Sequence, residues 1–332
     1  MKKRVLFLLS VIPWLLQAQA PAPTKPEPPR AIIDPAQVDE DYRFQGEYSG
    51  TAGDKVIGAQ VWAQGDGKFE AVAYQGGLPG DGWDGVRETV KHASGAINES
   101  KDVVAFKADN DVTAKLDGKN ITVFAADNSA IATLPRKDRI SPTMGAKAPD
   151  GAVVLFSGKD NNHFPDGKVT QDGLLEQGAT SSDKFGDCTL HVEFMLSYMP
   201  KARGQGRSNS GVYLQGRYET QVLDSFALEG KNNECGGIYS IHAPKVNMCF
   251  PPLTWQTYDI EFSAAKYDTD AKKTSNAKMT VKHNGIVIHE NADVPHTTTA
   301  APVKEENTPG PLHLQNHGNP VRYRNIWLLP KR

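Results

Sequence analysis

Residues 209–223 read Asn-Ser-Gly-Val-Tyr-Leu-Gln-Gly-Arg-Tyr-Glu-Thr-Gln-Val-Leu, with apolar and polar side chains alternating on both sides of Gly216. This period of two predicts two neighbouring β-strands, over residues 211–215 and 218–223. One face of these strands would be apolar. The other would hold amides, a carboxylate and an aromatic ring, which suit a hydroxyl-rich ligand, although plain solvation of an outer face is the alternative. The polar face carries Tyr213, Gln215, Arg217, Glu219 and Gln221.

The same alternation recurs along most of the chain and predicts an all-β protein. Short strands and turn signals fill residues 41–140 and 151–332, and no segment shows a sustained helical period. Asp66-Gly67 and His283-Asn284-Gly285 are hairpin signals. We expect a small β-rich domain at 41–140, a linker at 141–150 and a jelly-roll sandwich at 151–332.

The first forty residues are typical of an exported protein. Lys2-Lys3-Arg4, an apolar stretch and Ala18-Gln19-Ala20 predict a signal peptide over residues 1–20, with an uncleaved anchor as the less favoured alternative. A proline-rich linker is expected over 21–40. No later apolar run is long enough to span a bilayer. We therefore expect export to the periplasm or the extracellular space, without a membrane span.

The charge balance argues against nucleic acid as a partner. The 332 residues include 37 Lys and Arg against 39 Asp and Glu, a formal net charge of −2. There is no basic excess for phosphate contacts.

Three cysteines, Cys188, Cys235 and Cys249, leave one unpaired if a disulfide forms. We expect Cys235 to pair with Cys249, because the two flank one loop, while two buried thiols are the alternative. The loop from Asp224 to Cys249 also holds carboxylates and a histidine, which is typical of an acid–base site. The candidate catalytic residues of this loop are Asp224, Glu234 and His242.

The stretch 309–327 is dense in His and Arg. Arg322 or Arg324 could polarise a carbonyl or hold a carboxylate, and His313 and His317 are further candidates for ligand binding. No motif specifies a cofactor. Ca²⁺ could bind at 160–167, or a metal at the two histidines, but neither spacing is specific. The polar strand residues expected to be merely solvated are His191, Glu193, Asp259 and Glu261.

Several long motifs of residues 151–330 closely resemble the 3-keto-disaccharide hydrolase family. They occur in order at 154–160, 209–225, 231–239, 255–259 and 317–327. The resemblance implies a concanavalin A-like β-sandwich and a carbohydrate partner, namely a glycoside whose sugar is oxidised to a ketone at C3. The oligomeric state is not specified.

A C3 ketone acidifies the proton at C2, so that a base can remove it while the glycosidic oxygen leaves from C1. Addition of water gives net hydrolysis. We expect Glu219 or Asp224 as the base, Arg217 or Arg322 beside the enolate, and Glu234 or His242 as the acid, all converging on one hollow. The alternatives are a glycan-binding module without activity and a glycosidase with two carboxylates. The expected substrate-binding residues are Tyr213, Gln215, Arg217, Gln221, His313, His317, Arg322 and Arg324.

Overall fold

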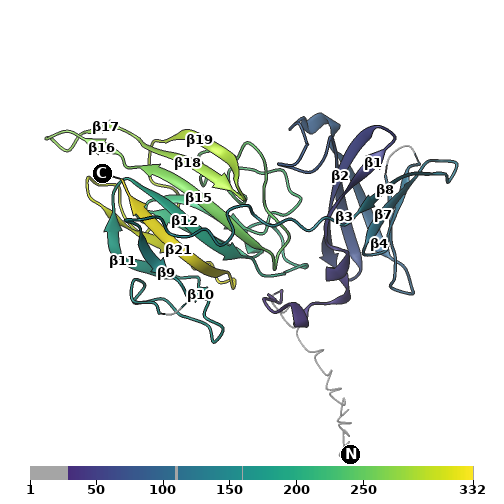
Figure 1. Ribbon diagram of the computed structural model, residues 1–332, viewed down its shortest axis with the longest axis horizontal. Coiled ribbons are helices and arrows are strands. Elements are labelled where there is room, and N and C mark those ends of the chain that lie inside the picture. Colours follow the sequence, from purple (N-terminus) through teal and green to yellow (C-terminus); the bar gives the residue numbers. More distant parts are fainter. Residues whose placement is uncertain (1–28, 109–110, 159, 332) are drawn as a thin grey trace, which may run out of the picture.

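The computed structural model describes residues 29–108, 111–158 and 160–331, which form an N-terminal β-barrel and a C-terminal β-sandwich side by side (Figure 1). The predicted all-β class is confirmed. The predicted signal peptide lies outside the described residues, as does the start of the predicted proline-rich linker.

Eight antiparallel strands close the barrel, each paired with its neighbour in sequence and β1 with β8. The hairpin predicted at Asp66-Gly67 joins β2 to β3, and both residues have positive φ, 55° and 70°, as a two-residue hairpin turn of this kind requires. The strands are β1 (Gly46–Ala52), β2 (Lys55–Gly65), β3 (Lys68–Gln75), β4 (Lys91–Ile97), β5 (Val104–Lys107), β6 (Thr113–Leu116), β7 (Asn120–Phe124) and β8 (Ala130–Pro135). The short 3-10 helices are η1 (Pro35–Gln37), η2 (Glu40–Phe44) and η3 (Arg87–Thr89).

The segment before the barrel is packed against the sandwich. Ile32 exchanges both backbone hydrogen bonds with Tyr198, at 3.0 and 2.8 Å, and its side chain is buried. The described end of the predicted linker at 21–40 is therefore an attached segment rather than a free tether.

Two antiparallel sheets form the sandwich. The larger has the order β10-β21-β12-β15-β18-β19, with β9 beside β21, and the smaller has the order β11-β20-β13-β14. The larger sheet contains β9 (Val153–Phe156), β10 (Leu175–Glu176), β12 (Cys188–Met195), β15 (Trp255–Ser263), β18 (Ala277–His283), β19 (Ile286–Val294) and β21 (Arg322–Pro330). The smaller contains β11 (Ala179–Phe185), β13 (Asn209–Leu214), β14 (Tyr218–Leu223) and β20 (Gly310–Leu314); β16 (Lys266–Tyr267) and β17 (Lys273–Ser275) pair apart, and η4 spans Gly204–Gly206.

The core of the sandwich lies between these sheets and follows the predicted alternation. Val212 and Val222 of the smaller sheet are fully buried in one cluster with Leu190 and Ile260 of the larger. Burying such side chains contributes roughly 1.5–3 kcal/mol each. The opposite, polar face of β13 and β14 is therefore turned outward.

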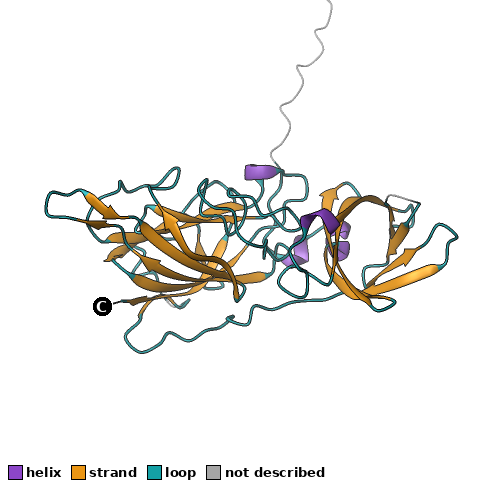
Figure 2. Cartoon of the chain, turned by 90° about the horizontal axis from the view of Figure 1, so that it is seen from above, coloured by secondary structure: helices purple, strands orange, loops and turns teal. Residues whose placement is uncertain are grey.

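Barrel and sandwich share this core. Trp62, Val72 and Tyr74 point out of the barrel wall and belong to the same buried cluster as Met248 of the sandwich. The connection at 136–150 then runs from the barrel along the sandwich (Figure 2). The two parts are thus joined by packing as well as by the chain.

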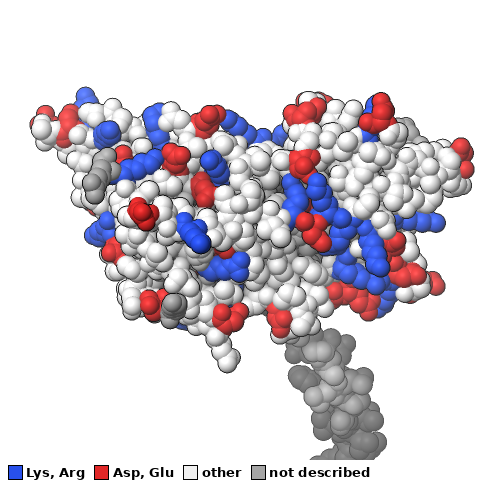
Figure 3. Space-filling view, in the orientation of Figure 1, with Lys and Arg blue, Asp and Glu red and all other residues white. Residues whose placement is uncertain are grey.

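Acidic and basic side chains are interspersed over the face shown in Figure 3. None of the helices in the described ranges is long and apolar enough to cross a membrane.

Replacement of Gly285 by alanine should destabilise the protein by about 1–3 kcal/mol. Gly285 has φ 79° in the β18–β19 turn, and an added Cβ would lie 2.4 Å from Cγ of Pro142 in the inter-domain connection. Gly118→Ala is the matched control, since Gly118 has φ 88° but meets no atom closer than 3.9 Å. Urea unfolding measures both. Equal losses would contradict the role of the Pro142 contact.

Candidate functional site

The polar face of the smaller sheet centres on Glu219. Tyr213 on β13 pairs with Glu219 on β14, so both side chains lie on the outer side of the sheet. The Tyr213 hydroxyl donates to Oε2 of Glu219 at 2.7 Å, and Nε2 of Gln315 donates to that hydroxyl oxygen at 3.1 Å. His313 on β20 packs edge-on against the Tyr213 ring, with centroids 5.6 Å apart. These four side chains form one contiguous group.

The carboxyl of Glu219 is almost completely buried, with 2% of the residue exposed. Burial raises its pKa to about 8, and the hydrogen bond from Tyr213 only partly offsets that rise. Gly211 makes room for the carboxyl, because a Cβ there would lie 2.2 Å from Oε1 of Glu219. A carboxyl with such a pKa can take up or release a proton near neutral pH.

Beside Glu219 lies a cluster of side-chain amides. Nε2 of Gln221 and Nδ2 of Asn209 both donate to Oε1 of Gln205, each at 3.1 Å, and Nε2 of Gln205 donates to the Asn233 carbonyl at 2.7 Å. Oδ1 of Asn209 is buried without a hydrogen-bond partner. Buried polar atoms are nearly always paired, so this unpaired acceptor is unusual.

The segment 234–239 forms one wall of this site. Gly236 and Gly237 exchange backbone hydrogen bonds with Gln221, both at 2.9 Å, and the Tyr239 amide donates to the Glu219 carbonyl at 3.2 Å. Gly237 has no room for a side chain, since a Cβ would lie 2.6 Å from the Asn232 carbonyl oxygen. The segment thereby covers the edge of β14.

The predicted Cys235–Cys249 disulfide does not hold this segment: all three cysteines are free and buried. Sγ of Cys235 lies 3.2 Å from the Tyr258 hydroxyl, and Sγ of Cys249 donates to the Leu223 carbonyl at 3.6 Å. Other bonds hold the segment instead. The Cys235 amide donates to Oγ of Ser225 at 2.9 Å, for example.

Arg217 holds the segment 304–308 over the other side of the face. Its guanidinium donates to the Lys304 carbonyl at 2.7 Å, the Thr308 carbonyl at 2.8 Å and Oε1 of Glu306 at 3.1 Å. It also donates to Oε1 of Gln215 at 3.0 Å. Arg217 and Gln215, which were both predicted to bind substrate, are therefore engaged in holding loops.

Asp224 forms a buried ion pair with Arg207. Oδ2 of Asp224 accepts from Nε and Nη2 of Arg207 at 3.0 and 2.6 Å, and both side chains are at most 3% exposed. Because both partners are buried, this ion pair has a structural role and links β14 to the segment before β13.

None of the remaining predicted side chains has a described contact with the Glu219 carboxyl. Glu234 accepts from the Gly230 and Lys231 amides at 2.7 and 3.0 Å, and His242 contacts the Asp293 carbonyl at 2.7 Å. The side chains near 217, 224, 234 and 322 therefore share no cavity. Arg322 forms an ion pair with Glu176. Arg324 forms an ion pair with Glu193 and stacks over the Trp255 ring. His317 is exposed, in a loop where Oδ1 of Asn319 accepts from the backbone amide of Asn209.

His191, Glu193 and Asp259 were expected to be solvated, but the connection at 136–150 covers them. Nδ1 of His191 lies 2.6 Å from Oδ1 of Asp259, and the Gly145 amide donates to Oε1 of Glu193 at 2.6 Å. Burial opposes ionisation of Glu193, yet hydrogen bonds, those from His191 and Asn325 foremost, outweigh it and lower its pKa to about 2. This network anchors the connection.

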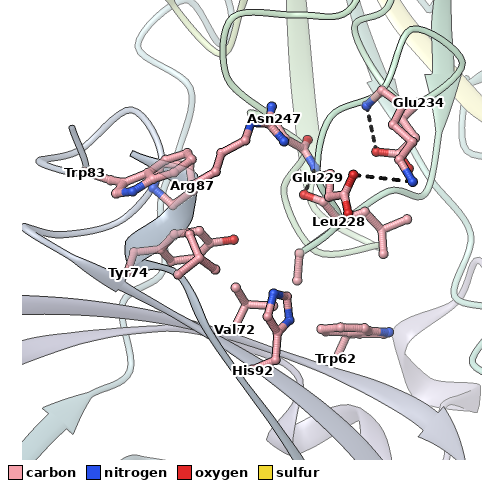
Figure 4. Close-up of a pocket in the computed structure, with 14 residues that line it drawn as sticks. Trp62, Val72, Tyr74, Trp83, Arg87, His92, Leu228, Glu229, Glu234 and Asn247 are labelled. Atoms are coloured by element: carbon pink, nitrogen blue, oxygen red, sulfur yellow. Dashed lines mark hydrogen bonds and ion pairs between the residues drawn. The ribbon is translucent and has the colours of Figure 1, made fainter. Parts of the chain in front are cut away.

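A cavity of about 420 Å³ lies between barrel and sandwich, separate from Glu219 (Figure 4). Trp62, Tyr74 and Trp83 of the barrel face Glu229 and Glu234 of the sandwich across it. Nε1 of Trp83 is buried without a hydrogen-bond partner. Aromatic rings with a few polar groups are typical of a ligand pocket.

No cluster of three or more His, Cys, Asp or Glu side chains that could hold a metal occurs in the described part of the chain. The predicted Ca²⁺ stretch forms a turn, in which Nδ2 of Asn161 donates to the Gly167 carbonyl at 2.7 Å.

A family model for the 3-keto-alpha-glucoside-1,2-lyase-like domain matches residues 151–329. The chain belongs to this family. The match covers the whole sandwich, including the Glu219 face, and confirms the resemblance found in the sequence. It makes the chain a glycosyl hydrolase-like protein, for which a sugar is the expected class of substrate. No curated protein matches the chain.

Three crystal structures of candidate glycosyl hydrolases from Parabacteroides distasonis ATCC 8503 are similar to this chain. The first is 30% identical and covers 55% of this chain and 85% of its own, with a TM-score of 0.50. The others are 18% and 21% identical, with TM-scores of 0.40 and 0.38; they cover 55% and 54% of this chain and 95% and 99% of their own.

Asp224→Asn should destabilise this family member by about 3–5 kcal/mol, because it leaves the buried Arg207 charge without its partner. Replacing both partners with apolar residues, Arg207→Met with Asp224→Leu, should cost less than the single change. Urea unfolding gives the free energies. A single variant as stable as the wild type would contradict the structural role of the pair.

The free energy of unfolding should fall as the pH rises from about 4.5 to about 8, relative to Glu219→Gln. The folded state keeps the Glu219 proton that the unfolded chain releases above its ordinary pKa of 4.5, so deprotonation favours unfolding. The slope attributable to this group is at most about 1.4 kcal/mol per pH unit. Parallel stability curves for the two proteins would contradict the raised pKa.

Proposed function

We propose that the protein cleaves the glycosidic bond of 3-keto-glycosides by elimination across C1 and C2, with Glu219 as the base. The observation that carries this proposal is the buried carboxyl of Glu219, whose pKa of about 8 suits proton abstraction near neutral pH. Membership of the 3-keto-alpha-glucoside-1,2-lyase-like family supports the substrate class.

In the proposed reaction, the ionised Glu219 takes the C2 proton, which the neighbouring C3 ketone has acidified. The C2–H electron pair is delocalised onto the C3 ketone as an enolate, and then forms the C1–C2 double bond as the C1–O bond breaks. The leaving oxygen takes a proton from water and departs as an alcohol, and the protonated Glu219 returns its proton to solvent. Addition of water across the double bond then gives net hydrolysis, and without it the enzyme is a lyase.

The surroundings of Glu219 favour elimination over hydrolysis by two carboxylates. Hydrolysis of an unoxidised glycoside uses a pair of carboxyl groups about 5–9.5 Å apart. The described hydrogen-bond partner of the Glu219 carboxyl is the Tyr213 hydroxyl, not a second carboxyl group. One base beside hydroxyl and amide donors fits a substrate that its own ketone activates.

The neighbouring groups have proposed roles that follow from their hydrogen-bonding chemistry. The Tyr213 hydroxyl orients the Glu219 carboxyl. The free Oδ1 of Asn209 accepts from a sugar hydroxyl. The amide of Gln315, already a donor toward Tyr213, is the proposed donor to the developing enolate oxygen.

Glu219→Gln should lower kcat for elimination from a 3-keto-glucoside by about 10²–10⁴-fold, because an amide cannot take the proton. Gly211→Ala should also lower kcat, since its Cβ would displace the Glu219 carboxyl. Glu261→Gln, at an exposed carboxylate of the larger sheet, is the matched control with unchanged rate. Release of the leaving group is measured, with circular dichroism to check folding.

In the wild type, kcat/KM should rise with pH and level off above about 8, because only the ionised Glu219 acts as base. Full activity of folded Glu219→Gln would contradict the proposal. Saturable binding of the sugar without any product would instead support a glycan-binding protein.

The specific observation that favours such a binding role is the cavity between the domains, where Trp62, Tyr74 and Trp83 offer aromatic surface and Trp83 an unpaired N–H. In that case Trp83→Ala would abolish binding and Glu219→Gln would not.

We further propose that the protein is exported, with removal of residues 1–20, as the composition of its first residues indicates.

A further inference from the structure

The interior of the N-terminal barrel is packed at one end and hollow at the other. At the packed end Phe44, Phe69 and Leu116 are fully or almost fully buried, and the two phenyl rings lie edge to face with centroids 5.6 Å apart. The hollow end encloses a cavity of about 300 Å³. Protein interiors seldom contain voids much larger than a water molecule, so a cavity of this size needs a reason.

The cavity exists because the inward strand positions around it carry alanine. Ala71 on β3 pairs with Ala93 on β4, and Ala59 on β2 pairs with Ala73 on β3, so these four methyl groups face the barrel interior. The residues between them, such as Val72, face outward into the shared core with the sandwich. Larger side chains at the four positions would close the hollow.

One lysine, Lys91, is among the residues that line this apolar cavity. Lys91 pairs directly with Ala73, so it lies on the inward side of β4, and it is exposed to solvent. The next residue, His92, pairs with Val72 on the outward side of β4, and part of it also lines the cavity. This cavity, here called the chamber, is therefore apolar and has the lysine side chain at its solvent-exposed edge.

We propose that the barrel binds a small amphiphile, with an unbranched apolar chain in the chamber and an anionic head at Lys91, as in a medium-chain fatty acid. Closed eight-stranded barrels have an interior just wide enough to hold one small ligand. The volume lies at the small end of the range for ligand pockets, which favours a short chain over a full-length lipid. This site is independent of Glu219 and of sugar cleavage.

Calorimetric titration of the delipidated full-length protein with decanoate tests the proposal. We expect saturable binding of one decanoate, weakened at least tenfold by Ala71→Leu combined with Ala93→Leu, which fill the chamber. Ala105→Leu on β5 is the matched control, since Ala105 is exposed on the outer surface and should bind decanoate normally. Circular dichroism compares the folding of the variants.

Lys91→Gln tests the head group without changing the core. It should weaken decanoate binding several-fold and leave binding of the neutral decanol unchanged. Absence of binding to the wild type, or equal binding by the filled variant, would overturn the site. Equal decanoate binding by Lys91→Gln would overturn the anionic head.

Discussion

Burial of the Glu219 carboxyl against the Tyr213 hydroxyl is the constraint on which the candidate site depends. The outer face of an antiparallel sheet is usually solvated, and a glutamate there keeps an ordinary pKa. In this protein the segments 234–239 and 297–308 cover that face, so the carboxyl is desolvated and its pKa rises to about 8. The proton chemistry of the site is therefore a consequence of how loops cover one sheet.

Charged residues around the site hold the covering segments in place. Arg217 binds three residues of the segment 304–308, and the buried pair of Arg207 and Asp224 fixes the chain on both sides of the β13–β14 hairpin. Such residues affect proton transfer at Glu219 only indirectly, by positioning the segments around it. A change at Asp224 would then act first on stability, whereas a change at Glu219 would act first on proton transfer.

Much of the fold could be predicted from the sequence, because strands and two-residue turns are set by local patterns. Asp66-Gly67 and Asn284-Gly285 adopt positive φ at the turns where they were expected. Glu219, Gln221 and Tyr213 were likewise found on one strand face, since alternation fixes the direction of side chains.

The rest depends on contacts between distant segments, which no local pattern encodes. The sequence did not reveal that Asp224 would meet Arg207, that Arg217 would hold a segment some ninety residues later, or that 141–146 would cover His191. The expected Cys235–Cys249 bond is absent from the structure, in which both thiols are free and buried. The amides of Gln205 and Asn209 were missed because they lie before the predicted strand.

The most direct test of the central claim is a pH titration of the Glu219 carboxyl carbon by ¹³C NMR, assigned by comparison with Glu219→Gln. We expect a midpoint near 8. A midpoint near 4.5, the ordinary value for a glutamate, would contradict it, because the carboxyl would then be solvated and no tuned base would lie on this face.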